Sequence, residues 1–121
     1  MENKKEEFIQ KICQVIYDKK GFNILALDVK DVSTIADCLI IAEGNVGRHV
    51  TAIAHSIVKE IEEQHGFRPH NIEGVDSGDW VLVDYVDVIV HMFMPGTREK
   101  FRLEELWSKG KPLELKLALS V

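Results

Sequence analysis

Two stretches of this chain carry the apolar periodicity of an α-helix. Apolar side chains recur every three or four residues over about 4–20 and again over 46–65, with charged residues between them. This spacing predicts two helices that each bury one face. Gly21 and Gly66 follow these stretches and are suitable helix ends. Asn45 stands where a capping side chain is expected for the second helix.

Shorter apolar stretches predict a set of strands. In chain order we expect strands over 24–29, 37–43, 70–75 (at a sheet edge), 80–85 and 87–94. The centre of the second strand is continuously apolar, which suits a strand covered on both faces. The last two strands are expected to form an antiparallel hairpin with its tip at Val86. Valine fits poorly at the positive φ of a two-residue hairpin turn, so this tip is expected to use a different turn or one bent strand.

The end of the chain predicts a short helix and a tail. Thr97 can cap a helix over about 98–107, and the tail over 113–121 alternates in places, which suits either an added strand or a loosely held end. The order of elements predicts a single α/β domain over 1–121 with a mixed sheet flanked by helices. Its core spans about 5–108, and residues 109–121 form the tail.

Composition and charge narrow the function classes. The 121 residues suffice for one compact core, and the net charge of −5 disfavours non-specific binding to DNA or RNA. An acidic domain is better suited to a basic protein surface. The charged start of the chain is unlike a secretory leader, and no apolar stretch approaches the ~20 residues of a membrane span, so we expect a cytoplasmic location. Cys13 and Cys38 lie within apolar patterns and are interpreted as reduced core cysteines.

Candidate catalytic residues are sparse. The five histidines lack the spacing of a metal site, and no serine or cysteine nucleophile motif is present. The turn from Gly44 to Gly47 precedes a helix and could hold phosphate, although a structural strand-to-helix turn is the favoured interpretation. Four later carboxylates could hold metal if they converged; they are Asp76, Asp79, Asp84 and Asp87. We predict a non-enzyme with no cofactor and no metal, and the alternative is a nucleotidyltransferase-like enzyme that uses the Gly44 turn and these carboxylates.

Aromatic residues offer the remaining functional signal. Trp80 and Tyr85 flank the apolar strand that contains Asp84, and exposed Trp and Tyr beside carboxylates are common anchors for protein partners. For Trp80 a core position and an interface position are both open. Trp107 is assigned to the core.

Five sequence blocks, taken in their order and spacing, resemble the ribosomal silencing factor family, also called Iojap-like. They span about 25–107 and are ALDVKDVSTIADCLIIAEG, RHV with the helix after it, EG, DWVLVDYVDVIVH and REKFRLEELW. The resemblance implies a degenerate nucleotidyltransferase fold without catalytic carboxylates. It also implies binding to the large ribosomal subunit through its protein numbered fourteen, on the face that meets the small subunit. Such binding would block subunit joining and repress translation when nutrients are scarce, with no cofactor.

The same resemblance places the partner-binding surface on the hairpin over 80–87. It implies that Trp80 and Tyr85 are apolar anchors and that Asp84 and Asp87 are charge partners for a basic ribosomal protein. Arg98 matches a family position and is included in this surface, although a structural role is an equal alternative. The chain departs from the family at the hairpin tip, where Val86-Asp87 replaces a common Gly-Asp. The alternating tail or an exposed strand edge could also support a homodimer.

Overall fold

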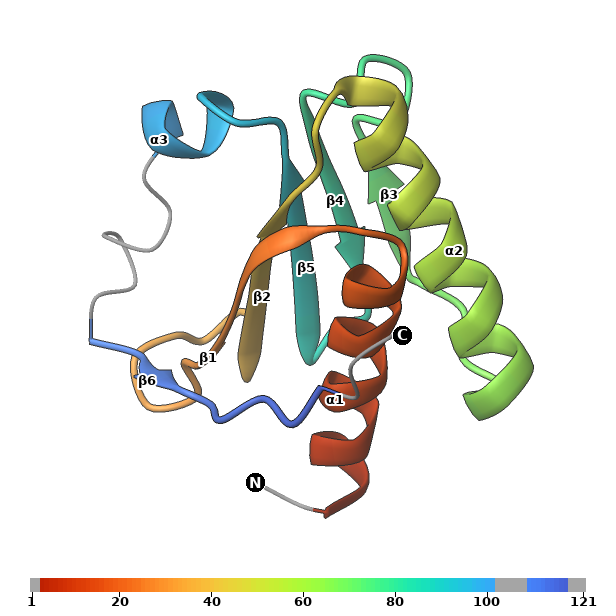
Figure 1. Cartoon of the computed structure of the whole chain (residues 1–121). Helices are drawn as coiled ribbons and strands as arrows, with labels where there is room; N and C mark the ends of the chain where they lie inside the picture. The colour runs from red at the N-terminus through yellow and green to blue at the C-terminus, as the bar shows by residue number, and fades with distance from the viewer. Residues whose placement is uncertain (1–2, 102–108, 118–121) are drawn as a thin grey trace.

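The computed structural model describes residues 3–101 and 109–117 and has a mixed sheet with two long helices on one face (Figure 1). The helices are α1 (Asn3–Asp18), α2 (Gly47–His65) and the short α3 (Thr97–Phe101). The strands are β1 (Phe22–Asp28), β2 (Cys38–Glu43), β3 (Asn71–Glu73), β4 (Trp80–Asp84), β5 (Val88–Phe93) and β6 (Lys111–Pro112). The predicted α/β architecture is confirmed.

The sheet is organised by a central parallel pair. The strand order is β3-β4-β5-β2-β1-β6, and β2 pairs in parallel with β5 from Cys38 opposite Val88 to Glu43 opposite Phe93. The other neighbouring strands are antiparallel. All six residues of β2 are buried, as the continuous apolar run predicts. The strand expected at a sheet edge before the hairpin is also confirmed as β3.

Strand alternation divides the core between the two faces of the sheet. On one face, α1 and α2 lie side by side (Figure 1) and their apolar stripes pack against alternate residues of the central strands. These strand residues are Ala26, Cys38, Ile40, Ala42, Val81, Val83, Val88, Val90 and Met92. The opposite face carries a smaller apolar cluster. It consists of Leu27, Val29, Leu39, Ile41 and Phe93, with Leu25, Trp80 and Ile89 packed against it.

The two cysteines belong to the first of these clusters. Cys13 and Cys38 are free thiols and are fully buried. Burial raises the pKa of the Cys38 thiol to about 12. Both side chains therefore act as small apolar core residues, as predicted.

The ends of α2 are set in different ways. Gly66 ends the helix in the left-handed conformation with φ 72°, as expected from the sequence. The predicted capping by Asn45 is wrong. The residue before the helix is Val46 in extended conformation, and no side-chain hydrogen bond caps the helix there. The N–H of Asn45 instead donates to Nδ1 of His49 at 3.0 Å.

Two glycines hold the turn before β4 against the start of α2. A Cβ atom at Gly78 would collide with the backbone of Gly47, and one at Gly47 would collide with the carbonyl of Ser77. Gly78 also has a positive φ of 74°. This close backbone contact fixes where Trp80 begins β4.

The chain after β5 returns across the sheet. β6 pairs with the edge of β1 and lies just before the stretch over 113–121 where an added strand was one expectation, while residues 113–117 form no strand. The side-chain amide of Gln10 on α1 then donates to the carbonyl of Glu114 and accepts from the N–H of Lys116. The second half of the helix predicted over 98–107, with Trp107, lies outside the described residues. Among the described helices, none is long and apolar enough to cross a membrane.

The β4–β5 connection is a tight turn with a valine at its centre. Val86 has φ 74°, and the N–H of Asp87 donates to the carbonyl of Tyr85 at 2.9 Å, which forms a three-residue γ-turn. The carboxylate of Asp84 accepts the N–H of Val86 at 2.7 Å. The turn is not a two-residue hairpin turn, as expected, but the reason for that expectation is wrong, because Val86 does adopt the positive φ that a β-branched side chain disfavours.

Replacing Val86 by glycine is expected to stabilise the protein. Relief of the strained φ contributes ~1–3 kcal/mol, and the greater freedom of glycine in the unfolded chain offsets ~0.5–1 kcal/mol of that. Urea unfolding of Val86→Gly should show a net gain of about 1 kcal/mol. Val32→Gly, at an exposed loop valine without a positive φ, is the matched control and should lose stability. A Val86→Gly variant that is less stable than wild type would contradict strain at the tip.

Candidate partner-binding surface

Along β4 and β5, alternate side chains lie on the face of the sheet opposite α1 and α2. They form a surface here called the Trp80 face. It consists of Trp80, Leu82 and Asp84 on β4 with Ile89 and His91 on β5. Leu82 lies directly opposite His91 in the antiparallel register. All but the buried His91 are partly accessible. This surface therefore combines apolar area with one carboxylate.

Trp80 is held in place by its neighbours on β5. Its indole N–H donates to Nδ1 of His91 at 3.0 Å, and its ring lies 5.0 Å from the ring of Phe93. Because Nδ1 accepts this hydrogen bond, the neutral imidazole carries its proton on Nε2. The indole is therefore oriented by both packing and a directional hydrogen bond.

The burial of His91 makes this arrangement sensitive to pH. Desolvation lowers the pKa of His91 to about 4, because the charged imidazolium is disfavoured away from water. Protonation at Nδ1 would also remove the acceptor for the indole N–H. The Trp80 face is thus built around a neutral histidine.

Tyr85 does not share a surface with Trp80. The two residues are five apart along the hairpin, and Tyr85 packs against the helix-covered cluster, with its ring 5.1 Å from that of Phe8 on α1. Trp80 packs against the cluster on the opposite face. The sequence interpretation expected one patch that presents both aromatic anchors. The structure instead places them on opposite faces of the sheet. A partner on the Trp80 face would contact Trp80 without Tyr85.

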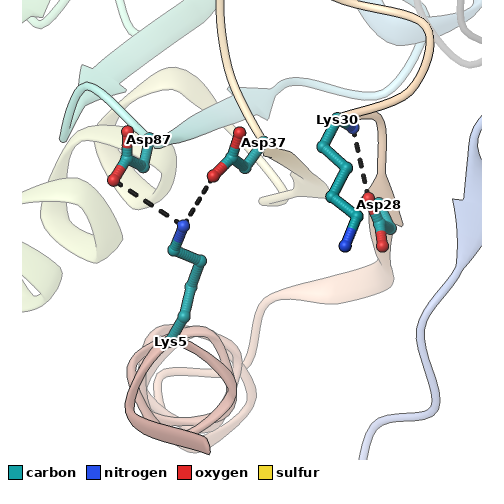
Figure 2. Close-up of polar contacts among 5 residues, drawn as sticks. All are labelled: Lys5, Asp28, Lys30, Asp37 and Asp87. Carbon is teal, nitrogen blue, oxygen red and sulfur yellow. Dashed lines mark hydrogen bonds and ion pairs between the residues drawn. The ribbon is translucent and has the colours of Figure 1, made fainter. Parts of the chain in front are cut away.

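The two carboxylates of the hairpin have different surroundings. Asp84 lies on the Trp80 face and also accepts the N–H of Val86. Figure 2 shows Lys5 reaching from α1 toward both Asp37 and Asp87, with Nζ–carboxylate distances of 2.5 Å and 3.7 Å. Asp87 is still 64 % exposed, so its carboxylate remains accessible at the tip. In the same view the N–H of Lys30 donates to Asp28 and closes the neighbouring bend.

Arg98 has a structural environment. Its guanidinium is buried and donates to the carboxylate of Glu43 at 3.1 Å and to the backbone carbonyl of Asn23. The side-chain amide of Asn23 donates to the same carboxylate at 2.8 Å. These contacts tie the start of α3 to the ends of β1 and β2, and they account for the arginine without a partner molecule.

The four carboxylates named for an enzymatic site do not all gather at the Gly44 turn. Asp76 and Asp79 flank the turn at Ser77 and Gly78 that contacts Gly47. Asp84 lies at the opposite end of β4, because the register places Glu43 beside Phe93 and Phe93 beside Trp80. Two backbone N–H groups of the Gly44 turn are also engaged, since Gly44 donates to the carbonyl of Phe93 and Asn45 to His49. Within residues 3–101 and 109–117, no group of three or more His, Cys, Asp or Glu residues could hold a metal ion.

Sequence reasoning missed three residues of this region. Leu82 and Ile89 add apolar area to the Trp80 face, and His91 orients the indole. The signal was strand alternation, because Trp80, Leu82 and Asp84 share a parity that Tyr85 does not. The orienting role of His91 depends on the β4–β5 register, which a single sequence does not give.

Comparison with known proteins gives a consistent result across the chain. A family model described as "Ribosomal silencing factor during starvation" matches residues 2–119. The chain is 37% identical to the ribosomal silencing factor RsfS of Halalkalibacterium halodurans over 95% of this chain and 97% of that protein. It is 38% identical to the RsfS of Bacillus subtilis over 85% and 86%.

More distant relatives and solved structures agree. A mouse protein named mitochondrial assembly of ribosomal large subunit protein 1 is 29% identical over 83% of this chain and 45% of its own length. A crystal structure of a Chromobacterium violaceum protein superimposes with a TM-score of 0.83 at 32% identity, covering 99% of this chain and 95% of that one. A Bacillus halodurans structure gives 0.78 at 34% identity, covering 91% and 99%.

The neutral state of His91 is expected to make stability depend on pH. The folded pKa of about 4 lies below the unfolded value of 6.5, so stability is fully present above pH 6.5 and is lost as the pH falls toward 4. The loss attributable to His91 is about 3 kcal/mol. His91→Asn keeps an acceptor for the indole but does not titrate. The free energy of unfolding of wild type and of His91→Asn is measured by chemical unfolding at pH 7 and pH 4. Between these two pH values, wild type should lose about 3 kcal/mol more than the variant. Parallel pH profiles would rule out a buried neutral histidine.

Proposed function

Because the chain belongs to the ribosomal silencing factor family, whose members regulate translation in association with the ribosome, we propose that it docks on the large ribosomal subunit. The contact is made with the subunit protein numbered fourteen. The bound domain then occupies space that the small subunit needs, and this blocks formation of the joined ribosome in the cytoplasm. The family match over residues 2–119 is the observation that carries this proposal.

The Trp80 face is the surface that we propose for this contact. It offers apolar area from Trp80, Leu82 and Ile89, none of which is fully buried. An indole held by His91 and Phe93 loses little conformational freedom on binding, which favours a hot-spot role. The half-buried carboxylate of Asp84 lies at one end of the same face.

Charge supports a basic partner for this face. The net charge of the chain is −5, and exposed acidic residues surround the start of β4 and the edge strand β3. They are Glu73, Asp76 and Asp79. Such a rim steers association with a positively charged ribosomal protein and makes the rate of binding depend on salt.

The proposed mechanism requires only occupancy. A rigid domain on the joining face excludes the small subunit by volume, so no bond is made or broken and no cofactor takes part. The effect is therefore stoichiometric with bound protein, and it ends when the domain dissociates.

Trp80→Ala is expected to weaken docking on the large subunit. Loss of a buried aromatic anchor typically costs ~2 kcal/mol or more, which corresponds to about a 30-fold weaker association. Co-sedimentation of purified protein with isolated large subunits through sucrose gradients, at low and moderate salt, measures this change.

The matched control is Phe67→Ala, which removes an exposed aromatic ring that packs with Phe8 on the helix-covered side. It should co-sediment as wild type does. Circular dichroism confirms that each variant is folded. Wild-type protein that stays at the top of the gradient would refute large-subunit docking. Normal docking by a folded Trp80→Ala variant would refute the Trp80 face as the docking surface but not docking itself.

A further inference from the structure

A pocket of about 470 Å³ lies on the helix-covered side of the sheet, away from the Trp80 face. It is formed by the start of α1, the residues after α2 and the β4–β5 tip. Its lining includes Lys4, Lys5, Phe8, Phe67, Arg68, Tyr85 and Asp87. None of these residues belongs to the surface proposed for the ribosome.

Aromatic rings make up the apolar part of this pocket. The ring of Phe8 meets that of Tyr85 at 5.1 Å and that of Phe67 at 5.6 Å, both in edge-on geometry. Phe8 is buried, whereas Phe67 is 54 % exposed. An exposed phenylalanine beside a buried aromatic pair provides a contact surface for one apolar side chain of a partner.

The hydroxyl of Tyr85 is the second feature that points to a ligand. It is shielded from solvent and has no hydrogen-bond partner among the described residues. A buried hydroxyl without a partner typically costs ~1–3 kcal/mol, so such groups are rare unless something supplies the bond. Burial raises the pKa of Tyr85 to about 12, and the neutral phenol therefore keeps a proton to donate.

The rim of the pocket is cationic on an otherwise acidic chain. Lys4, Lys5 and Arg68 face a single lining carboxylate, that of Asp87, while the net charge of the chain is −5. Lys5 is engaged by Asp37 and Asp87. Arg68 bonds Glu62 through Nε at 2.7 Å, and its side chain is 80 % exposed. Lys4 is also exposed. Lys4 and Arg68 are thus the cations best placed to meet an anion from outside.

We propose that this pocket binds an acidic peptide segment of a partner protein. One apolar side chain of the peptide packs against Phe8 and Phe67, and flanking carboxylates meet Lys4 and Arg68. A backbone carbonyl of the peptide accepts the hydrogen bond from Tyr85 once the side chains that shield this hydroxyl shift on binding. The site is separate from the Trp80 face, so both can be occupied at once.

Selection from a random twelve-residue peptide library displayed on phage tests this site. Wild-type protein should enrich peptides that carry Asp or Glu around one aromatic or aliphatic residue. Amide chemical-shift mapping with an enriched synthetic peptide should locate it at Phe8, Phe67 and Tyr85. No enrichment, enrichment of basic or uncharged peptides, or shifts at other residues would overturn the proposal.

Two variants sharpen the test. Tyr85→Phe removes only the unpartnered hydroxyl, so it is expected to be more stable than wild type and to bind the peptide at least threefold more weakly. Arg68→Glu should weaken binding at least tenfold, while Arg48→Glu, which reverses an exposed arginine at the other end of α2, should leave it unchanged. Equal affinity of the Arg68→Glu and Arg48→Glu variants would contradict charge recognition at this rim.

The ribosome experiment separates this site from the proposed function. Tyr85→Phe and Arg68→Glu are expected to co-sediment with large subunits as wild type does. Peptide binding without co-sedimentation would refute the proposed function and leave this site in place. Co-sedimentation without peptide binding would refute this site and leave the proposed function in place.

Discussion

The parallel pairing of β2 with β5 is the constraint on which the rest of the structure depends. Both strands are almost entirely buried, so their register cannot slip by one residue without moving apolar side chains to the wrong face. Once β5 is fixed, its antiparallel pairing with β4 decides which hairpin side chains face α1 and α2 and which face away. The Trp80 face and the pocket at Tyr85 are therefore two consequences of one register, and they lie on opposite sides of the sheet.

This separation changes what the hairpin can do. A partner on the Trp80 face meets an oriented indole, two aliphatic side chains and a carboxylate, while Tyr85 is left to the helix-covered side. The tip that joins the two strands is strained at Val86, and Lys5 anchors its Asp87 from α1. The hairpin thus links two surfaces of different character, one apolar with an acidic rim and one aromatic with a cationic rim.

The sequence predicted what depends on local periodicity. The stripes of α1 and α2 and the run of β2 were clear because their spacing is a property of each segment alone. Spacing alone could also have placed Trp80 and Tyr85 on opposite faces of the sheet, because they lie five residues apart in nearly continuous strand. The sequence interpretation grouped them as two aromatic anchors and so overlooked this. The parallel pairing, the bond from the indole to His91 and the buried contact of Arg98 with Glu43 depend on residues far apart in the chain. Capping by Asn45 failed because the helix begins one residue later than expected, so that Val46 occupies the capping position and has no side-chain oxygen to offer.

We propose that occupancy of the large subunit prevents subunit joining. Light scattering of purified large and small subunits, mixed at a magnesium concentration that supports joining, tests it directly. Preincubation of large subunits with increasing amounts of this protein should lower the joined fraction in proportion to bound protein, reaching a plateau near one protein per subunit. An undiminished scattering amplitude with large subunits saturated by the protein would contradict the account.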